Sequence, residues 1–518
     1  MKIKHYDKNK ILLQSNDSKE TFWSIKNGRI VKKRSISEPS ETLPKSLLAE
    51  RQIYKVYGNR PPYPLTLIKG TYRLLPNLPL QVDLRKKTVL NVLDKPLEAI
   101  DEKWRLEDYY IAFENAIRTD RKYKIIFMSS GWDSSGILAA LVKKYGPSHV
   151  VPIILSLNYG LREPVNTYEI KKAKKICQFF NVQLRIVSSI YFDEKRLRDA
   201  ILALRQNHLF NLTAINHWTL WEAVKKLGYS PKQSAVFAGE YSDGAHNFGF
   251  SQNFSVVYPE KGYRQYADKV RTYFISPGFL SRIQNENNIS QDQLVKSFMP
   301  GKILKKQNNL VALCKTMLIG MFYNDDRGPY TSSAGTTAEK SIKNEYVRLM
   351  KNIFPRRIEQ LYASIIEFYK RHHWQGSTVM GLQLFKPKGY HLKLPFGDKK
   401  ILALLAKMPT RYGRGLEPES TKYPLKMFCK TQVNYPLEFQ EGPHSYVYDT
   451  NQSLSLIKIL YKNTILGKMM RKENSEILKG NKEMQQEINN QKEADPKTIE
   501  KLIVAFLTSG LIKHDKKN

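Results

Sequence analysis

The sequence has little cysteine and no long apolar run. Its three cysteines, Cys177, Cys314 and Cys429, lie far apart in 518 residues and form no C-x-x-C pair. This spacing argues against a disulfide framework and against a cysteine-bound zinc site, so a cytoplasmic location is the default expectation. No run of about 18 apolar residues occurs, so we expect no membrane span. The first ten residues, MKIKHYDKNK, also lack the apolar core of a signal peptide.

Acidic residues are scarce relative to basic ones. Lys and Arg total 84 against 48 Asp and Glu, which gives a formal net charge of +36. A surplus of this size favours a polyanionic partner such as tRNA or an acidic glycan. General solubilisation by lysine explains it equally well, because no arginine-rich block or known nucleic-acid motif accompanies the charge.

The pattern of apolar residues divides the chain into three parts. Residues 1–105 combine turn residues with short apolar alternations and predict a small β-rich region. In residues 106–430, apolar runs alternate with segments of helical periodicity, and the later part of this region is mostly helical. Such alternation predicts an α/β fold with a doubly wound parallel sheet. Residues 431–518 predict a charged helical tail. The expected strands of the central region are 124–128, 150–157, 182–186 and 234–239.

The stretch MSSGWDSSGILAALVKKYG, residues 128–146, reads as the end of a strand, a loop and a helix. The amides of Ser130, Gly131 and Ser134 are placed to bind an anion at the helix N-terminus, and Gly131 permits a close approach. Asp133 would repel an anion unless a divalent cation bridged the two. The alternative is that these serines merely cap the helix.

A second polar segment, FAGEYSDGAHNFGF, follows the strand expected at 234–239 and places Glu240 and Asp243 between glycines. Ligands of doubly wound sheets bind beyond the carboxyl ends of the strands, so both polar segments should meet there. Asp133 and Asp243 are therefore predicted to share a magnesium ion. A glycine-rich turn with solvated acids is the alternative.

The ordered set of motifs resembles a known family. SSGWDSS resembles the SGGxDS loop of the N-type ATP pyrophosphatases (PP-loop proteins), and GEYSDG resembles the GEGxDE segment of the asparagine synthetases. HLKLPFGDKKILALLAKMP (391–409) looks like their R-x-P-F-x-D segment, and STKYPLK (420–426) is similar to their K-x-x-L-R element. Upstream, LIKGTYRLLPN (67–77) resembles the stretch that leads into their synthetase domain.

The resemblance implies a fold, a reaction and roles for individual residues. The fold would be Rossmann-like, of the adenine nucleotide alpha hydrolase type. The reaction would be that of an ATP-dependent, AMP-forming amide ligase, in which an adenylated carboxylate is attacked by ammonia or another amine. Lys422 would face the phosphates, Glu260 would take a proton from the amine, and Asp133 and Asp243 would bind Mg²⁺. The expected ATP-binding residues are Ser129, Ser130, Gly131, Asp133, Ser134, Ser135, Gly239 and Glu240.

This sequence departs from the family pattern at several positions. Ser130 and Gly244 replace a loop glycine and the last glutamate of GEGxDE, and Lys393 stands where the family has arginine. Lys2 follows the first methionine, where glutamine-hydrolysing asparagine synthetases have a nucleophilic cysteine. Residues 1–105 are therefore interpreted as a relic of the glutaminase domain. The ammonia would be free or come from a separate glutaminase, or the nucleophile would be an amine on the substrate.

Two other functions stay open. A tRNA-modifying PP-loop enzyme would suit the positive charge, although the cysteine pairs of thiolating members are absent. The third possibility is a non-catalytic basic interaction module on a degenerate synthetase fold. The sequence does not identify the carboxylate substrate.

Overall fold

The structure is a computed structural model that describes most of the central region and parts of both ends. The described residues are 2–15, 21–33, 63–66, 70–75, 78–92, 97–158, 163–207, 209, 212–247, 288, 290, 293, 348–349, 351–371, 374, 378–409, 412, 422–440, 459, 464–477, 503 and 506–507.

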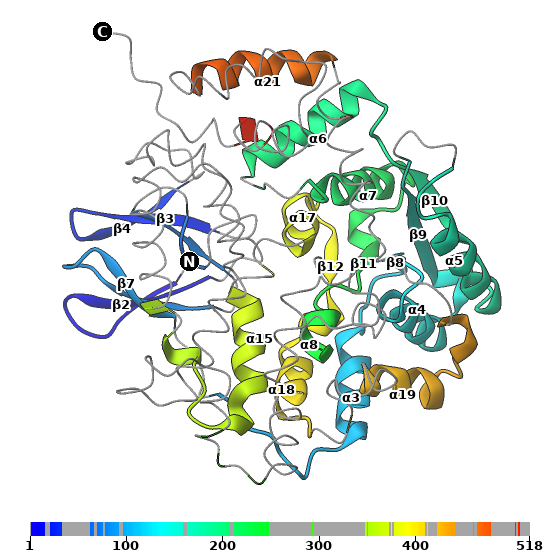
Figure 1. Ribbon diagram of the computed structural model, residues 1–518, viewed down its shortest axis with the longest axis horizontal. Helices are drawn as coiled ribbons and strands as arrows, with labels where there is room; N and C mark the ends of the chain where they lie inside the picture. The colour runs from blue at the N-terminus through cyan, green and yellow to red at the C-terminus, as the bar shows by residue number, and fades with distance from the viewer. Residues whose placement is uncertain are drawn as a thin grey trace.

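A five-stranded parallel sheet lies among the helices of the central region of the sequence (Figure 1). The strand order is β10-β9-β8-β11-β12. From β8 the chain first adds strands on one side of the sheet and later on the other, so the connections diverge between β8 and β11. In doubly wound sheets this switch point is where ligands bind. The strands are β8 (Tyr123–Phe127), β9 (Val150–Ser156), β10 (Arg185–Ser188), β11 (Ser234–Phe237) and β12 (His391–Lys393).

Helices cover both faces of this sheet because its strands are apolar on both sides. Alternate residues of β8 show this directly, since Ile125 and Phe127 enter one buried cluster and Ile126 enters the other. The first cluster includes residues of α6 (Glu194–Gln206), α7 (Ala214–Lys226), α17 (Thr378–Leu384) and α21 (Thr464–Ile477). The second includes residues of α3 (Leu106–Ala116), α4 (Trp132–Tyr145), α5 (Thr167–Phe179), α15 (Leu361–Arg371), α18 (Lys399–Lys407) and α19 (Tyr423–Gln432). The predicted doubly wound α/β fold is confirmed.

Three of the four predicted strands lie within about two residues of their expected positions, and the third does not. The expected strand at 182–186 is observed three residues later, as β10 at Arg185–Ser188. Val182 instead ends the preceding helix: its amide donates to the carbonyl of Cys177 at 2.9 Å, and Asn181 takes a left-handed conformation with φ of 52°. The buried Val182 side chain therefore closes α5 in the manner of a C-terminal helix cap.

The N-terminal part is β-rich, as predicted, and its described residues form two antiparallel sheets. One contains β1 (Lys2–His5), β2 (Lys10–Gln14), β6 (Leu80–Asp83) and β7 (Thr88–Val92), and the other contains β3 (Thr21–Lys26), β4 (Arg29–Lys33) and β5 (Thr71–Leu74). Their shared core includes Trp23, which is fully buried and stacks on Tyr72 with 4.9 Å between ring centroids.

The described C-terminal residues pack onto the central region. Leu466 and Met470 of α21 and Phe506 are buried in the same cluster as residues of α6, and Figure 1 shows α21 alongside that helix. The guanidinium of Arg205 lies 4.8 Å from the centre of the Phe506 ring. The predicted helical tail thus contributes apolar residues to the core. None of the helices described by the structure is long and apolar enough to span a membrane.

Candidate active site at the carboxyl edge of the sheet

The serine-rich loop between β8 and α4 is shaped by its own hydroxyl groups. The amide of Ser129 donates to Ser134 Oγ at 3.0 Å, and the amide of Gly131 donates to Ser129 Oγ at 3.2 Å. The two hydroxyls lie 3.0 Å apart. Ser130 of the loop and Ser135 of α4 are buried. Ser129 and Ser134 therefore fix the loop conformation.

No described side chain caps the start of α4. Its N-cap residue is Gly131, and no side-chain capping bond is formed there within the described structure. The first amides of a helix have no partner inside the helix and together present a partial positive charge. The serines thus do not act as the helix cap that was the alternative explanation, and the helix N-terminus offers its amides to an anion.

Asp133 and Asp243 meet at the ammonium group of Lys422. Lys422 Nζ lies 2.6 Å from Asp133 Oδ2 and 2.7 Å from Asp243 Oδ1. Asp133 stands in the first turn of α4 and Asp243 in that of α8 (Ser242–Asn247), which follows β11. The two carboxylates that the sequence assigned to one site therefore face a common point at the switch between β8 and β11.

Lys422 is held in an unusual state for a lysine. Its residue is only 6% exposed, and its backbone adopts the left-handed conformation, with φ of 58°, at the N-cap of α19. Burial opposes its charge, but the carboxylates of Asp133 and Asp243 outweigh that effect and raise the pKa of Lys422 above its ordinary value. For Asp133, burial is the main influence and raises the pKa, while Lys422 and the hydroxyl of Ser242 oppose the rise. Lys422 is thus a built part of the site and not one of the solvated surface lysines.

Glycines allow the two sequence motifs to approach each other. A Cβ at Gly239 would lie 2.8 Å from Asp133 Cβ and 3.1 Å from the Ser134 amide nitrogen. A Cβ at Gly397 would lie 2.6 Å from the ring of Tyr241, which itself has φ of 76°. Gly239 therefore allows the turn after β11 to pack closely on the serine-rich loop between β8 and α4. Gly397 in the same way allows the segment PFGD to pack on the segment GEYSDG.

Of the two predicted glutamates, Glu240 is among the described residues and Glu260 is not. Glu240 is half-buried in the turn before α8. Glu260 lies outside the described residues, so its role stays a prediction.

Two of the departures from the family pattern have local explanations. A Cβ at Gly244 would lie 3.1 Å from the indole of Trp374 and 3.2 Å from the ring of Tyr369. The space beside α8 is therefore filled by aromatic rings. Lys393 Nζ donates to the carbonyl of Ala116 at 3.1 Å and to that of Arg118, at the C-terminal end of α3. Lys393 thus ties β12 to α3 and not to the loop.

The donor set fits magnesium. Two carboxylates are the hard oxygen ligands that Mg²⁺ prefers, and they already face one cationic group. No cluster of three or more His, Cys, Asp or Glu side chains that could hold a metal occurs in the described parts of the chain. Mg²⁺ in nucleotide sites commonly takes one or two carboxylates and completes its shell with phosphate and water oxygens. Asp133 and Asp243 are the residues that would hold it.

Sequence reasoning missed three residues behind Asp133. Ser242 Oγ donates to Asp133 Oδ1 at 2.5 Å and lies 3.0 Å from His246 Nδ1, and His246 Nε2 lies 2.8 Å from the hydroxyl of Tyr109. Ser242 and His246 stand inside the second quoted motif, so their positions next to Asp243 were the available signal. Nothing in the sequence points to Tyr109.

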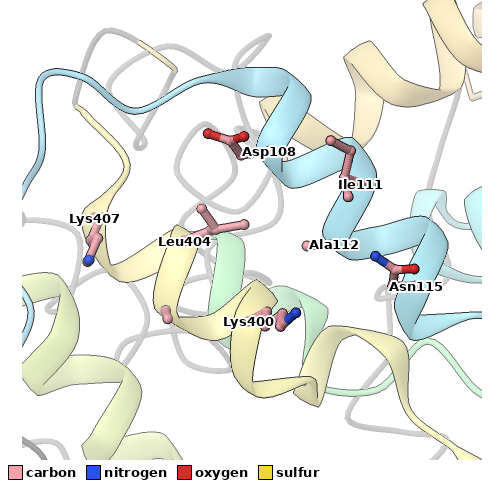
Figure 2. Close-up of a pocket in the computed structure, with 8 residues that line it drawn as sticks. Asp108, Ile111, Ala112, Asn115, Lys400, Leu404 and Lys407 are labelled. Atoms are coloured by element: carbon pink, nitrogen blue, oxygen red, sulfur yellow. The ribbon is translucent and has the colours of Figure 1, made fainter.

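A groove elsewhere on the surface is not part of this site. It lies between α3 and α18, holds about 300 Å³ and is lined by Ile111, Ala112 and Leu404 with Asp108, Lys400 and Lys407 at its edges (Figure 2). Its lining is mostly apolar and it contains neither Asp133 nor Asp243, so it does not combine the acids and the ammonium group found at the sheet edge.

Comparisons with known proteins return structural neighbours only. No protein-family model and no curated protein matches the chain. One neighbour is the U34-tRNA thiolase NcsA from Methanococcus maripaludis with its [4Fe-4S] cluster, at 14% identity and a TM-score of 0.21, covering 51% of this chain and 80% of that one. Another is the NH3-dependent NAD synthetase from Campylobacter jejuni in complex with nitrate, at 12% identity and a TM-score of 0.21, covering 47% of this chain and 93% of that one. At these TM-scores the two neighbours carry no argument about this protein, and the site is described from its own geometry.

Proposed function

We propose that the protein is an ATP-dependent, AMP-forming ligase that adenylates a substrate carboxylate and transfers the acyl group to ammonia or an amine. The observation that carries this proposal is the cluster of Asp133, Lys422 and Asp243 beside the uncapped N-terminus of α4. The cluster combines ligands for a cation with a buried positive charge. Both are needed where a chain of phosphates is held and cleaved.

Each part of the cluster has a separate role in this reaction. The amides of the first turn of α4, with Ser130, hold the pyrophosphate that leaves, and Gly131 permits its close approach to the backbone. Asp133 and Asp243 bind Mg²⁺, which when bound neutralises charge on the phosphate oxygens. Lys422 keeps its proton because of the two carboxylates, so its charge is available to the α- and β-phosphates during adenylation.

The remaining steps involve groups that are only proposed. Glu260 accepts a proton from the attacking amine. The nitrogen source is free ammonia, a separate glutaminase or an amine on the substrate, and we expect the pure protein to release no glutamate from glutamine. The substrate carboxylate stays unidentified, and a uronic acid of an anionic glycan would suit the net charge of +36.

The test is release of AMP and pyrophosphate from ATP with a panel of carboxylic acids and ammonia. Asp133→Asn should reduce this by on the order of a thousandfold, because a neutral amide replaces one anionic ligand at nearly equal volume. Asp108→Asn is the matched control, since Asp108 is an exposed carboxylate of α3 paired with Arg105. Circular dichroism checks that both variants fold. Production of ADP and phosphate, or equal rates for Asp133→Asn and the wild-type protein, would contradict the proposal.

A second candidate is a tRNA-modifying enzyme that uses the same ATP site, and the net charge of +36 favours it. Its test is a mobility shift with tRNA, whose affinity should fall steeply with salt concentration. Turnover of small carboxylic acids without any effect of tRNA would leave the amide ligase. Absence of ATP cleavage under every condition would leave a non-catalytic basic module.

A further inference from the structure

A chain of three buried side chains ends on the carboxylate of Asp133. Tyr109 of α3 reaches His246 of α8 through a contact of 2.8 Å between the phenol oxygen and Nε2. His246 Nδ1 lies 3.0 Å from both the hydroxyl and the carbonyl oxygen of Ser242. The Ser242 hydroxyl then reaches Asp133 Oδ1 at 2.5 Å. Tyr109 and His246 are 137 positions apart in the sequence, so the fold assembles this chain.

The directions of these hydrogen bonds follow from the groups themselves. A carbonyl oxygen only accepts, so the contact of His246 Nδ1 with the Ser242 carbonyl places the proton on Nδ1. In a neutral imidazole Nε2 is then an acceptor, and the Tyr109 hydroxyl donates to it. Ser242 cannot donate to a protonated Nδ1, so its hydroxyl proton points to Asp133. Every dipole in the chain thus has its positive end toward the carboxylate.

The residues around these three hydrogen-bonded side chains exclude solvent from them. Tyr109, Ser242 and His246 are each at most 1% exposed. The rings of Phe396 and Tyr109 both lie edge-on to the imidazole, at 5.4 and 5.7 Å between centroids. Burial raises the pKa of Tyr109 well above its ordinary value, so the phenol keeps the proton that it donates. Aligned hydrogen bonds in a low-dielectric interior polarise one another, and the bond to an ionised carboxylate is the strongest of the series.

We propose that Tyr109, His246 and Ser242 form a positioning relay that fixes Asp133 Oδ1, so that Oδ2, which accepts from Lys422 at 2.6 Å, is held facing the point that Asp133 shares with Asp243. This inference rests on the proposed function, because that function supplies the cation and the phosphates. The relay residues touch neither substrate nor metal. They act by setting the orientation of one ligand, as the hydrogen-bond partners of metal ligands commonly do, and loss of such a partner typically weakens metal binding by about 10–100-fold.

Binding of Mn²⁺ in the presence of ATP, followed by electron paramagnetic resonance, measures the relay without requiring turnover. Ser242→Ala removes the donor to Asp133 and should weaken Mn²⁺ binding by about 10-fold or more. His246→Leu should approach that loss. His246→Asn keeps a donor near the position of Nδ1 and should recover much of the affinity. Tyr109→Phe should give a smaller loss, because it removes only the most distant bond.

The decisive measurement is the coupling between the ends of the relay. If Tyr109 acts through Ser242, adding Tyr109→Phe to Ser242→Ala should cause no further loss of affinity, whereas independent packing effects would multiply. Tyr390→Phe is the matched control, because it also removes a hydrogen-bonding tyrosine hydroxyl. That hydroxyl donates to the backbone carbonyl of Tyr229, away from this site. It should leave Mn²⁺ binding unchanged.

A second measurement examines the relay in the protein without nucleotide. The ¹⁵N signals of the His246 ring, assigned by their loss in His246→Asn, should show a proton on Nδ1 and none on Nε2. A proton on Nε2 in the wild-type protein overturns the relay, as do multiplying effects of Tyr109→Phe and Ser242→Ala.

The outcomes separate the relay from the proposed function. Mn²⁺ and ATP binding with coupled variants but without pyrophosphate release supports the relay and rejects the ligase. Pyrophosphate release by a protein whose variants show no coupling rejects the relay alone. Failure of the wild-type protein to bind Mn²⁺ with ATP rejects both.

Discussion

Replacing Lys422 by methionine removes the one ammonium group that Asp133 and Asp243 share. Each ion pair, at 2.6 and 2.7 Å, has an attraction of about 6 kcal/mol at an effective dielectric constant near 20. Most of this offsets the cost of taking three charges out of water, since Lys422 is 6% exposed. Removing one partner of such a buried pair leaves that cost uncompensated. We therefore expect Lys422→Met to lower the free energy of unfolding by about 3–5 kcal/mol.

A divalent cation should reverse much of this loss. Without the ammonium group, Asp133 and Asp243 present two negative charges to one point, which is a site for Mg²⁺. Ligand at about 100 times its Kd stabilises a folded protein by about 2.7 kcal/mol, so Mg²⁺ should raise the Tm of Lys422→Met more than that of the wild-type protein. Asp243→Asn in the Lys422→Met background should restore stability in part and abolish the response to Mg²⁺.

Urea unfolding, with and without Mg²⁺, measures both effects. Lys430→Met is the control, because Lys430 is an exposed lysine on the same helix and its loss should change stability by less than about 0.5 kcal/mol. Equal stabilities of the two variants would refute the assigned ion pairs. Failure of Mg²⁺ to stabilise Lys422→Met would refute the two carboxylates as a cation site.

Three further predictions concern burial and close packing. Burial lowers the pKa of His217 from 6.5 to about 4, so the stability that is present above the unfolded pKa is lost as the pH falls. In urea unfolding, the free energy of unfolding of the wild-type protein should fall by roughly 2.5 kcal/mol more than that of His217→Leu between about pH 7.5 and 4.5. Equal losses in the two proteins would contradict this. Burial raises the pKa of Cys177 to about 12, so in a Cys314→Ser background the thiols should react with Ellman's reagent only after unfolding. Gly239→Ala should cost about 1–3 kcal/mol because its Cβ would strike Asp133 and Ser134. Gly131→Ala, whose Cβ meets only Ser129 Oγ at 3.4 Å, should cost less in urea unfolding, about 0.5–1 kcal/mol for alanine at a helix N-cap.

The fold was predictable where strands are buried on both faces. The apolar runs of β8, β9 and β11 have no other place than the centre of a sheet, and the structure buries them there. The edge strand β10 was misplaced because the alternation of Val182, Leu184 and Ile186 suggested a half-buried strand. In the structure Val182 caps α5 and Ile186 is 45% exposed. A two-residue period cannot distinguish a helix cap followed by an edge strand from a single longer strand.

The acids of the candidate site were predictable, but their surroundings were not. Asp133 and Asp243 follow buried parallel strands, and the carboxyl ends of such strands share one edge of the sheet. Lys422 was assigned only by resemblance, since it is 289 positions from Asp133 and has no strand to place it. Tyr109 appears in the sequence as one more apolar position of an amphipathic helix. Only the packing of α3 on α8 shows that its hydroxyl has a partner.

Gly244, at the position of the last glutamate of the GEGxDE pattern, lies where aromatic rings occupy the space for a side chain. The place that a side chain at 244 would take is filled by Trp374 and Tyr369. The remaining acids, Asp133 and Asp243, are both paired with Lys422. A third carboxylate beside them would be buried without a matching cation, at a cost of several kcal/mol. A glutamate at position 244 would therefore face two aromatic rings and disturb the balance between two carboxylates and one ammonium group.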